Sequence, residues 1–224
     1  MVWSSPETFL YSRKPEDFGK DELITPWGFP VLFSSWNYAG SEGKPVEISV
    51  FSAAEEVELF LNGQSVGRKA VPQDGTMPRS VGFETAYQPG RLEAVSYTGG
   101  QEVSRAVLET TGKPSRIRLT ADKKAVRPDG HDLVCVEIEL LDQEGRVVPD
   151  AELGLSAEVA GQGWLAGFGT GNPITAEDYT DNMTVSWRGR ALAILRSGYE
   201  SGEITMTVSA RNLPEESVTF RVTE

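Results

Sequence analysis

The chain has 224 residues, a formal net charge of −12 and a hydrophobic content of 39%. That length allows one large or two medium domains, and the apolar fraction suffices for a packed core, which excludes wholesale disorder. The acidic balance, without any run of Lys or Arg, excludes a phosphate-binding surface, so neither nucleic acid nor an anionic membrane is an expected partner.

The beginning of the sequence carries no targeting or membrane signal. No apolar run is long enough to cross a bilayer, and residues 1–5 lack the basic and hydrophobic regions of a signal peptide. From this abrupt start we expect a piece of a longer protein, with any targeting signals further upstream. The single cysteine, Cys135, allows no internal disulfide and weakly favours a cytoplasmic location.

Residues 1–28 mix aromatic side chains, including Trp3 and Trp27, with prolines and charges and show no periodicity. We expect an irregular lead-in that docks on a neighbouring domain. Residues 30–37 are predicted to form the first strand, and a glycine-punctuated loop follows.

Residues 44–69 carry the clearest local pattern in the chain. Apolar residues alternate with polar ones at 46–50 and again at 57–61, which is the period of half-buried antiparallel strands. Asn62-Gly63 then supplies the two residues that a type I′ hairpin turn prefers, and residues 64–69 read as the return strand. We expect three strands and an all-β module.

Further short strands are expected around residues 81–83, 91–97 and 102–109, with a hairpin turn at Gly99-Gly100. About seven short strands at this spacing are typical of a β-sandwich. A polar linker with Gly112 and Pro114 ends the module. We place the lead-in at residues 1–28, the first module at 29–111 and a second module at 112–224.

The second module repeats the strand pattern. Its clearest strand is 133–141, in which Val134, Val136, Ile138 and Leu140 share one face. Residues 117–119, 153–159, 191–196, 204–208 and 218–222 are the other expected strands. The whole chain is therefore predicted to be all-β, with two tandem sandwich domains.

No catalytic, cofactor or metal site is predicted. His131 is the only histidine and sits in a turn, which favours a solvent residue over a general base. One His and one Cys cannot form a usual zinc site, and the aspartates lack the spacing of a calcium loop. Gly167-Phe-Gly-Thr-Gly171 lacks the glycine spacing of a dinucleotide loop and is predicted to be a bulged turn near a sheet edge. Paired carboxylates cannot be identified from sequence alone.

The tryptophans are the remaining candidates for a binding site. An exposed aromatic ring flanked by amide or carboxylate side chains can stack on a sugar, and two segments have that composition. They are Trp36-Asn37-Tyr38 and the loop that contains Asn172 and Tyr179 and leads to Trp187. Packing in a core or between domains is the alternative for each of these residues, because burial is the common fate of aromatic side chains.

A succession of motifs resembles the modules that follow the catalytic barrel of glycoside hydrolase family 2 enzymes, most of all bacterial β-galactosidases. In the first module these motifs are Ser35-Trp-Asn-Tyr38, Gly43-Lys-Pro-Val46, Val57-Glu-Leu-Phe-Leu-Asn-Gly63 and Gly67-Arg-Lys69. In the second they are Leu119-Thr-Ala-Asp122, Arg127-Pro-Asp-Gly130, Asp142-Gln-Glu-Gly-Arg-Val-Val-Pro149, Gly169-Thr-Gly-Asn-Pro173 and Gly189-Arg-Ala-Leu-Ala-Ile-Leu-Arg196. The resemblance covers nearly all of the chain after residue 28.

The resemblance implies tandem immunoglobulin-like sandwiches without catalytic residues, since the catalytic glutamates of that family sit in its barrel. The expected partner is an upstream barrel, which the modules scaffold and whose entrance they shape; a galactoside-type carbohydrate and an oligomeric parent are further expectations. Two alternatives stay open: an autonomous carbohydrate-binding module, and a tandem immunoglobulin-like adhesion segment of a surface protein.

Overall fold

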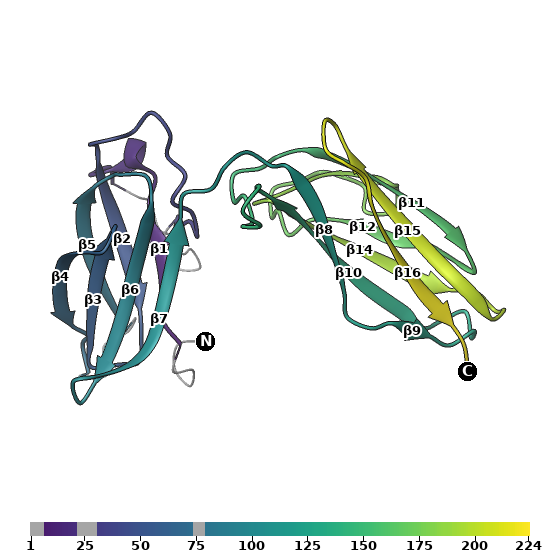
Figure 1. Cartoon of the computed structure of the whole chain (residues 1–224), viewed down its shortest axis with the longest axis horizontal. Coiled ribbons are helices and arrows are strands. Elements are labelled where there is room, and N and C mark those ends of the chain that lie inside the picture. The colour runs from purple at the N-terminus through teal and green to yellow at the C-terminus, as the bar shows by residue number, and fades with distance from the viewer. Residues whose placement is uncertain (1–6, 22–30, 74–78) are drawn as a thin grey trace. The chain divides into compact units, whose positions relative to one another are not determined.

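The protein, described by a computed structural model over residues 7–21, 31–73 and 79–224, is built from β-strands and turns. The only helix in these ranges is the 3-10 turn η1 (Pro15–Asp17). The chain divides into two compact units, Met1–Thr110 and Thr111–Glu224, each with two sheets (Figure 1). The all-β prediction is therefore confirmed, and within the described ranges no helix has the length and apolar character of a membrane span.

Unit 1 is a sandwich of two antiparallel sheets. The first has the order β1-β2-β5, formed by Phe9–Ser12, Pro45–Phe51 and Ser80–Ala86. The second has the order β4-β3-β6-β7, formed by Gln64–Ala70, Glu56–Leu61, Arg91–Thr98 and Gln101–Glu109. The apolar residues of the alternating pattern in β2 and β3 are buried in one core, as their period predicts: Val46, Ile48, Val50, Val57, Leu59 and Leu61.

The hairpin turn at Asn62-Gly63 has the predicted geometry. Both residues have positive φ, 52° and 80°, as a type I′ turn requires. Asn62 also joins a second turn, because its Oδ1 accepts from the Arg91 N–H at 2.8 Å and its Nδ2 donates to the Pro89 carbonyl at 3.1 Å. A Cβ on Gly90 would lie 2.0 Å from that Oδ1, so Gly90 leaves the space that the Asn62 side chain fills.

Two expectations for the beginning of the chain were wrong. The lead-in is not irregular throughout, since β1 lies within it and pairs with β2 from Phe9 opposite Phe51 to Ser12 opposite Ile48. Residues 31–37 form no strand, and their single ladder contact is a bridge between Phe33 and Ser12. Strand β1 has four residues, which are too few to show the two-residue alternation of a strand in the sequence. Its pairing with β2 is what identifies it as a strand. Trp3 and Trp27 lie outside the described residues.

Unit 2 is a larger sandwich of a four-stranded and a five-stranded sheet. The first has the order β12-β14-β10-β8, formed by Gly163–Gly169, Arg190–Ser197, Leu133–Leu141 and Arg116–Ala121. The second has the order β13-β11-β15-β16-β9, formed by Met183–Val185, Gly154–Gly161, Gly202–Ala210, Glu216–Val222 and Ala125–Val126. All pairs are antiparallel except β16 with β9.

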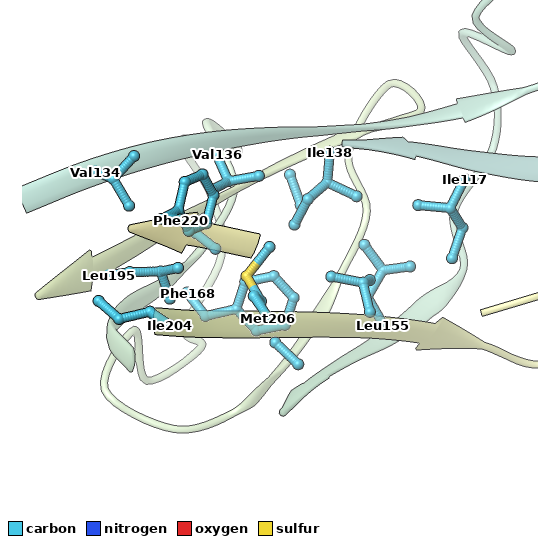
Figure 2. Packing of buried hydrophobic residues seen from close by; sticks show 14 of the residues in the cluster. Ile117, Val134, Val136, Ile138, Leu155, Phe168, Leu195, Ile204, Met206 and Phe220 are labelled. Atoms are coloured by element: carbon cyan, nitrogen blue, oxygen red, sulfur yellow. The ribbon is translucent and has the colours of Figure 1, made fainter. Parts of the chain in front are cut away.

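The core of unit 2 confirms the face predicted for residues 133–141, because Val134, Val136, Ile138 and Leu140 are fully buried. Figure 2 shows such side chains meeting between the two sheets, with β10 residues facing Ile204 and Met206 of β15. Each fully buried side chain of this kind stabilises the fold by about 1.5–3 kcal/mol.

The turn predicted at residues 167–171 is wrong in part. Gly163–Gly169 is strand β12, at one edge of its sheet, and the register shifts between Leu165 and Gly167. The predicted bulge and edge position are thus confirmed, but the segment up to Gly169 is a strand and not a turn. A run this rich in glycine has little strand propensity, so only its pairing with β14 makes it one.

Asp142 holds the first residues of unit 2 in place. Its carboxylate accepts from the N–H of Gly112 at 3.0 Å and from the N–H of Arg146 at 2.9 Å. The Arg146 guanidinium adds two bonds, at 2.9 and 2.7 Å, and the Asp142 side chain is fully buried. Burial by itself would raise the pKa of Asp142, but these four hydrogen bonds outweigh it and hold that pKa far below its usual range.

Candidate functional site

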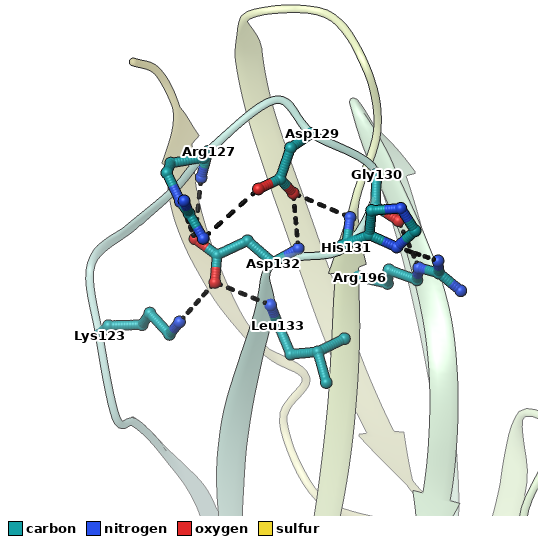
Figure 3. A network of polar contacts seen from close by, with 8 residues as sticks. All are labelled: Lys123, Arg127, Asp129, Gly130, His131, Asp132, Leu133 and Arg196. Carbon is teal, nitrogen blue, oxygen red and sulfur yellow. Dashed lines mark hydrogen bonds and ion pairs between the residues drawn. The ribbon is translucent and has the colours of Figure 1, made fainter.

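The only histidine is part of a structural network (Figure 3). Asp129 Oδ1 accepts from the N–H groups of His131 and Asp132, and His131 Nδ1 lies 2.9 Å from Arg196 Nη2. A hydrogen bond from Lys123 lowers the pKa of Asp132 to about 2, helped by the Arg127 N–H. These contacts stabilise the turn between β9 and β10. The side chain that His131 contacts there is an arginine, which is not a nucleophile that a general base could activate.

Metal-ligating side chains do not gather anywhere in the ranges 7–21, 31–73 and 79–224, where no group of three His, Cys, Asp or Glu residues could hold an ion. Asp129 and Asp132 cap the turn just described. Asp178 and Asp181 each accept hydrogen bonds within two residues, from Thr180 and Met183. Each of these four carboxylates is therefore engaged in a local turn.

Of the first predicted sugar-contact segment, Trp36 is a core residue. Its side chain is 0% exposed, its Nε1 donates to the Gln88 carbonyl at 2.9 Å, and its ring meets Tyr87 edge to face at a centroid distance of 5.1 Å. Tyr38 packs on the same cluster, and its hydroxyl lies 2.6 Å from Ser12 Oγ; burial raises the pKa of Tyr38 against the effect of that bond. Asn37 is half-buried and donates its N–H to Ser35 Oγ. Packing against Tyr38 and Tyr87 covers the Trp36 ring, so of the two alternatives left open by the sequence the structure shows core packing at this residue.

The second predicted segment behaves differently, because its three residues come together around the end of β12. The Tyr179 ring covers Gly169, where a Cβ would lie 2.3 Å from it, and the Tyr179 hydroxyl donates to the Thr170 carbonyl at 3.4 Å. Asn172 Oδ1 accepts from the Ile174 N–H at 3.2 Å, which closes the next turn. Trp187 lies against Gly171, with ring carbons 3.7–3.9 Å from the position of a Cβ there.

Beside Trp187 lies an open depression of about 440 Å³. Its lining combines one half-buried indole and an exposed leucine with hydroxyl, carboxylate and guanidinium groups: Glu137, Thr170, Trp187, Arg188, Arg190 and Leu192. The Arg188 guanidinium lies over the Trp187 ring, 4.5 Å from its centroid. Asn172 and Tyr179 do not line this depression, and they act on it by shaping the loop that contains Thr170.

The charges beside the depression are paired across three strands. Arg190 Nη2 lies 3.0 Å from Glu139 Oε1, and Arg190 Nε lies 3.3 Å from Glu137 Oε1. Glu139 also accepts from Arg118 Nε at 2.8 Å and is buried beneath the two arginines. Glu137 and Arg190 remain half exposed, at 50% and 52%.

Sequence reasoning missed Glu137, Arg188 and Arg190 as neighbours of Trp187. The outward alternation of β10 was the available signal, since it puts Glu137 and Glu139 on the face opposite the core. The register that sets Glu139 opposite Arg190 could not be read from a single strand.

Two family models match the chain. Residues 117–219 match "Glycoside hydrolase family 2 C-terminal domain 5", and residues 43–104 match a model described as a domain of unknown function, DUF4982. Together the two matches include most of both sandwiches.

Two relatives of this chain are much longer proteins named as glycosidases. The β-galactosidase BoGH2A of Bacteroides ovatus is 32% identical over 81% of this chain and 21% of its own length. A β-galactosidase of Thermoanaerobacter pseudethanolicus is 28% identical over 76% of this chain and 23% of its length. The chain thus spans about a fifth of the length of these curated relatives.

A solved structure has the same arrangement of strands. A glycosyl hydrolase family 2 member from Bacteroides cellulosilyticus superimposes with a TM-score of 0.88 at 35% identity, over 97% of this chain and 28% of that one. The match extends over both units.

Proposed function

The chain belongs to the C-terminal region of glycoside hydrolase family 2, and from this premise we propose that it serves a catalytic barrel as a non-catalytic scaffold. The observation that carries the proposal is the coverage: 97% of this chain corresponds to 28% of a family 2 hydrolase. In the proposed parent, the two sandwiches support the barrel and shape its entrance. The parent is a glycosidase, and β-galactosidase is the activity we propose for it, in line with the names of two relatives.

The residues described above support a structural role. His131, the candidate general base, lies beside Arg196 in a turn. Glu139 is an example of a carboxylate that is engaged in ion pairs, in its case with two arginines. The buried Trp36 cluster and the two apolar cores are what a rigid support requires.

The test compares two proteins. The reading frame that precedes Met1 is expected to encode a barrel, and a protein with that barrel is expected to hydrolyse a chromogenic β-galactoside. The 224-residue chain alone is expected to show no hydrolysis above a buffer blank. Hydrolysis by the chain alone at enzyme-like rates would refute the proposal, as would an upstream region without a barrel.

The scaffold role has its own measurement. Deleting both sandwiches from the longer protein is expected to lower the melting temperature of the barrel, because an apolar interface would be exposed to water. A barrel whose melting temperature and activity are unchanged by the deletion would contradict the scaffold role.

A further inference from the structure

Arg188 occupies a backbone position that an arginine does not favour. Its φ is 54°, and among the described residues only Asn62 and Asn212 share a positive φ without being glycine. Asparagine tolerates this left-handed region, whereas for most other L-residues it is strained. The Trp187 N–H donates to the Arg190 carbonyl at 2.9 Å, so residues 188 and 189 form a two-residue turn of the kind in which Asn-Gly is preferred.

The neighbouring position shows that this turn is fixed. Gly189 has a φ of 71°, and a Cβ there would lie 2.2 Å from the Val148 carbonyl oxygen. The close approach of Gly189 to Val148 therefore fixes the backbone conformation of the turn. Arginine occupies position 188 although its positive φ is unfavourable for this residue. Strained residues of this kind gather at binding and catalytic sites, where the side chain is needed.

The Arg188 side chain is directed into the depression at Trp187. Its guanidinium lies 4.5 Å from the indole centroid, in a cation–π contact. Glu137 and Arg190 add a carboxylate acceptor and guanidinium donors, both half exposed, and Thr170 adds a hydroxyl. A flat apolar surface beside convergent donors and acceptors is the composition of a site for a small polyhydroxylated ligand.

Size and charge narrow the class of ligand. The volume of about 440 Å³ lies within the roughly 300–1,000 Å³ of small-molecule sites. Both arginines that line the depression are already engaged, Arg190 by Glu137 and Glu139 and Arg188 by the Trp187 ring, so neither guanidinium is held ready for an ionic ligand. We propose that this depression binds a neutral pyranose, whose C–H groups pack on Trp187 and Arg188 while its hydroxyls bond Glu137 and Arg190.

The experiment titrates the ¹⁵N-labelled 224-residue chain with methyl β-galactopyranoside and follows the indole N–H signals by NMR. A single sugar of this size in an open site is expected to bind with a Kd on the order of 1 mM. The Trp187 signal, assigned by its loss in Trp187→Phe, is expected to shift in a saturable way. No saturable shift with sugar up to about a hundred times that concentration would overturn the proposal.

Two variants and a matched control locate the site. Trp187→Ala and Arg188→Asn are expected to weaken binding at least tenfold, read in both variants from the backbone N–H signals of residues 170–171 and 190–192, because Trp187→Ala removes the indole signal. Arg188→Asn is expected to leave the melting temperature equal or higher because asparagine suits the turn. Trp164 is the control: it is exposed and has Arg196 5.5 Å from its ring centroid, but it does not line the depression. Binding that Trp187→Ala leaves intact, or that Trp164→Ala removes, would contradict the assignment.

A final arm tests the neutrality of the ligand. Methyl β-glucuronide carries a carboxylate and is expected to bind no more tightly than the neutral sugar; a tenfold preference for it would refute the class proposed. Binding is measured without a barrel, so its failure leaves the scaffold proposal untouched. The converse also holds: if the scaffold proposal were refuted, the Trp187 titration would still test whether the depression binds a sugar.

Discussion

Replacing Asp142 by asparagine is expected to destabilise unit 2 strongly. The carboxylate is fully buried and accepts four hydrogen bonds, from the N–H groups of Gly112 and Arg146 and from two nitrogens of the Arg146 guanidinium. An asparagine keeps one oxygen, but its NH₂ group then faces donors that were bonded to Oδ2. Hydrogen bonds to a charged group contribute about 1.5–3 kcal/mol, so we expect a loss of about 2–3 kcal/mol in the free energy of unfolding.

Differential scanning calorimetry of the whole chain measures this loss. For a unit of this size, 1 kcal/mol corresponds to roughly 4 °C, so the unit 2 transition is expected to fall by about 8–12 °C. Asp178→Asn is the control, because Asp178 is exposed and accepts its hydrogen bonds from Thr180, two residues away; its effect is expected to stay below about 0.5 kcal/mol.

The pH dependence gives an independent check. The folded pKa of Asp142 is depressed, so its contribution is complete above the unfolded pKa of about 3.9 and is lost as the pH falls toward the folded value. The stability gap between wild type and Asp142→Asn is therefore expected to be constant from pH 7 to 5 and about 1 kcal/mol narrower at pH 3. A gap below about 0.5 kcal/mol at pH 7, or one that does not narrow in acid, would refute the reasoning.

Three further substitutions test other parts of the fold. Trp36→Ala is expected to cost unit 1 about 3–5 kcal/mol, because a fully buried aromatic side chain leaves a cavity; a loss below 1 kcal/mol in urea unfolding would contradict its burial. Gly90→Ala is expected to cost about 1–3 kcal/mol through the clash with Asn62 Oδ1, and the clash predicts that Asn62→Ala recovers part of that loss in a double-mutant cycle. Glu139→Gln is expected to cost about 1–2 kcal/mol, less at high salt because its arginine partners are half exposed, and equal losses at low and high salt would count against the ion pairs as the cause.

The class of fold and most of the strands could be predicted from local patterns in the sequence. The alternation of apolar and polar residues in 45–61 and 133–141 indicates which side chains face a core. The pair Asn62-Gly63 indicates a turn that requires two positive φ angles. Period and turn chemistry are local properties, so they can be read one strand at a time. The succession of motifs along both modules also indicates glycoside hydrolase family 2.

The different surroundings of the two tryptophans could be seen only once the chain was folded. Trp36 and Trp187 stand in segments of similar composition, yet Tyr38 and Tyr87 cover the first while the second borders a depression. The partners of Trp187 come from three stretches of chain, and the pairing of β10 with β14 sets their positions. Burial and juxtaposition depend on what packs across a sheet or between sheets, and no run of neighbouring residues encodes that. The short strand β1 and the glycine-rich β12 escaped prediction for the same reason, since each is a strand because of the partner it pairs with.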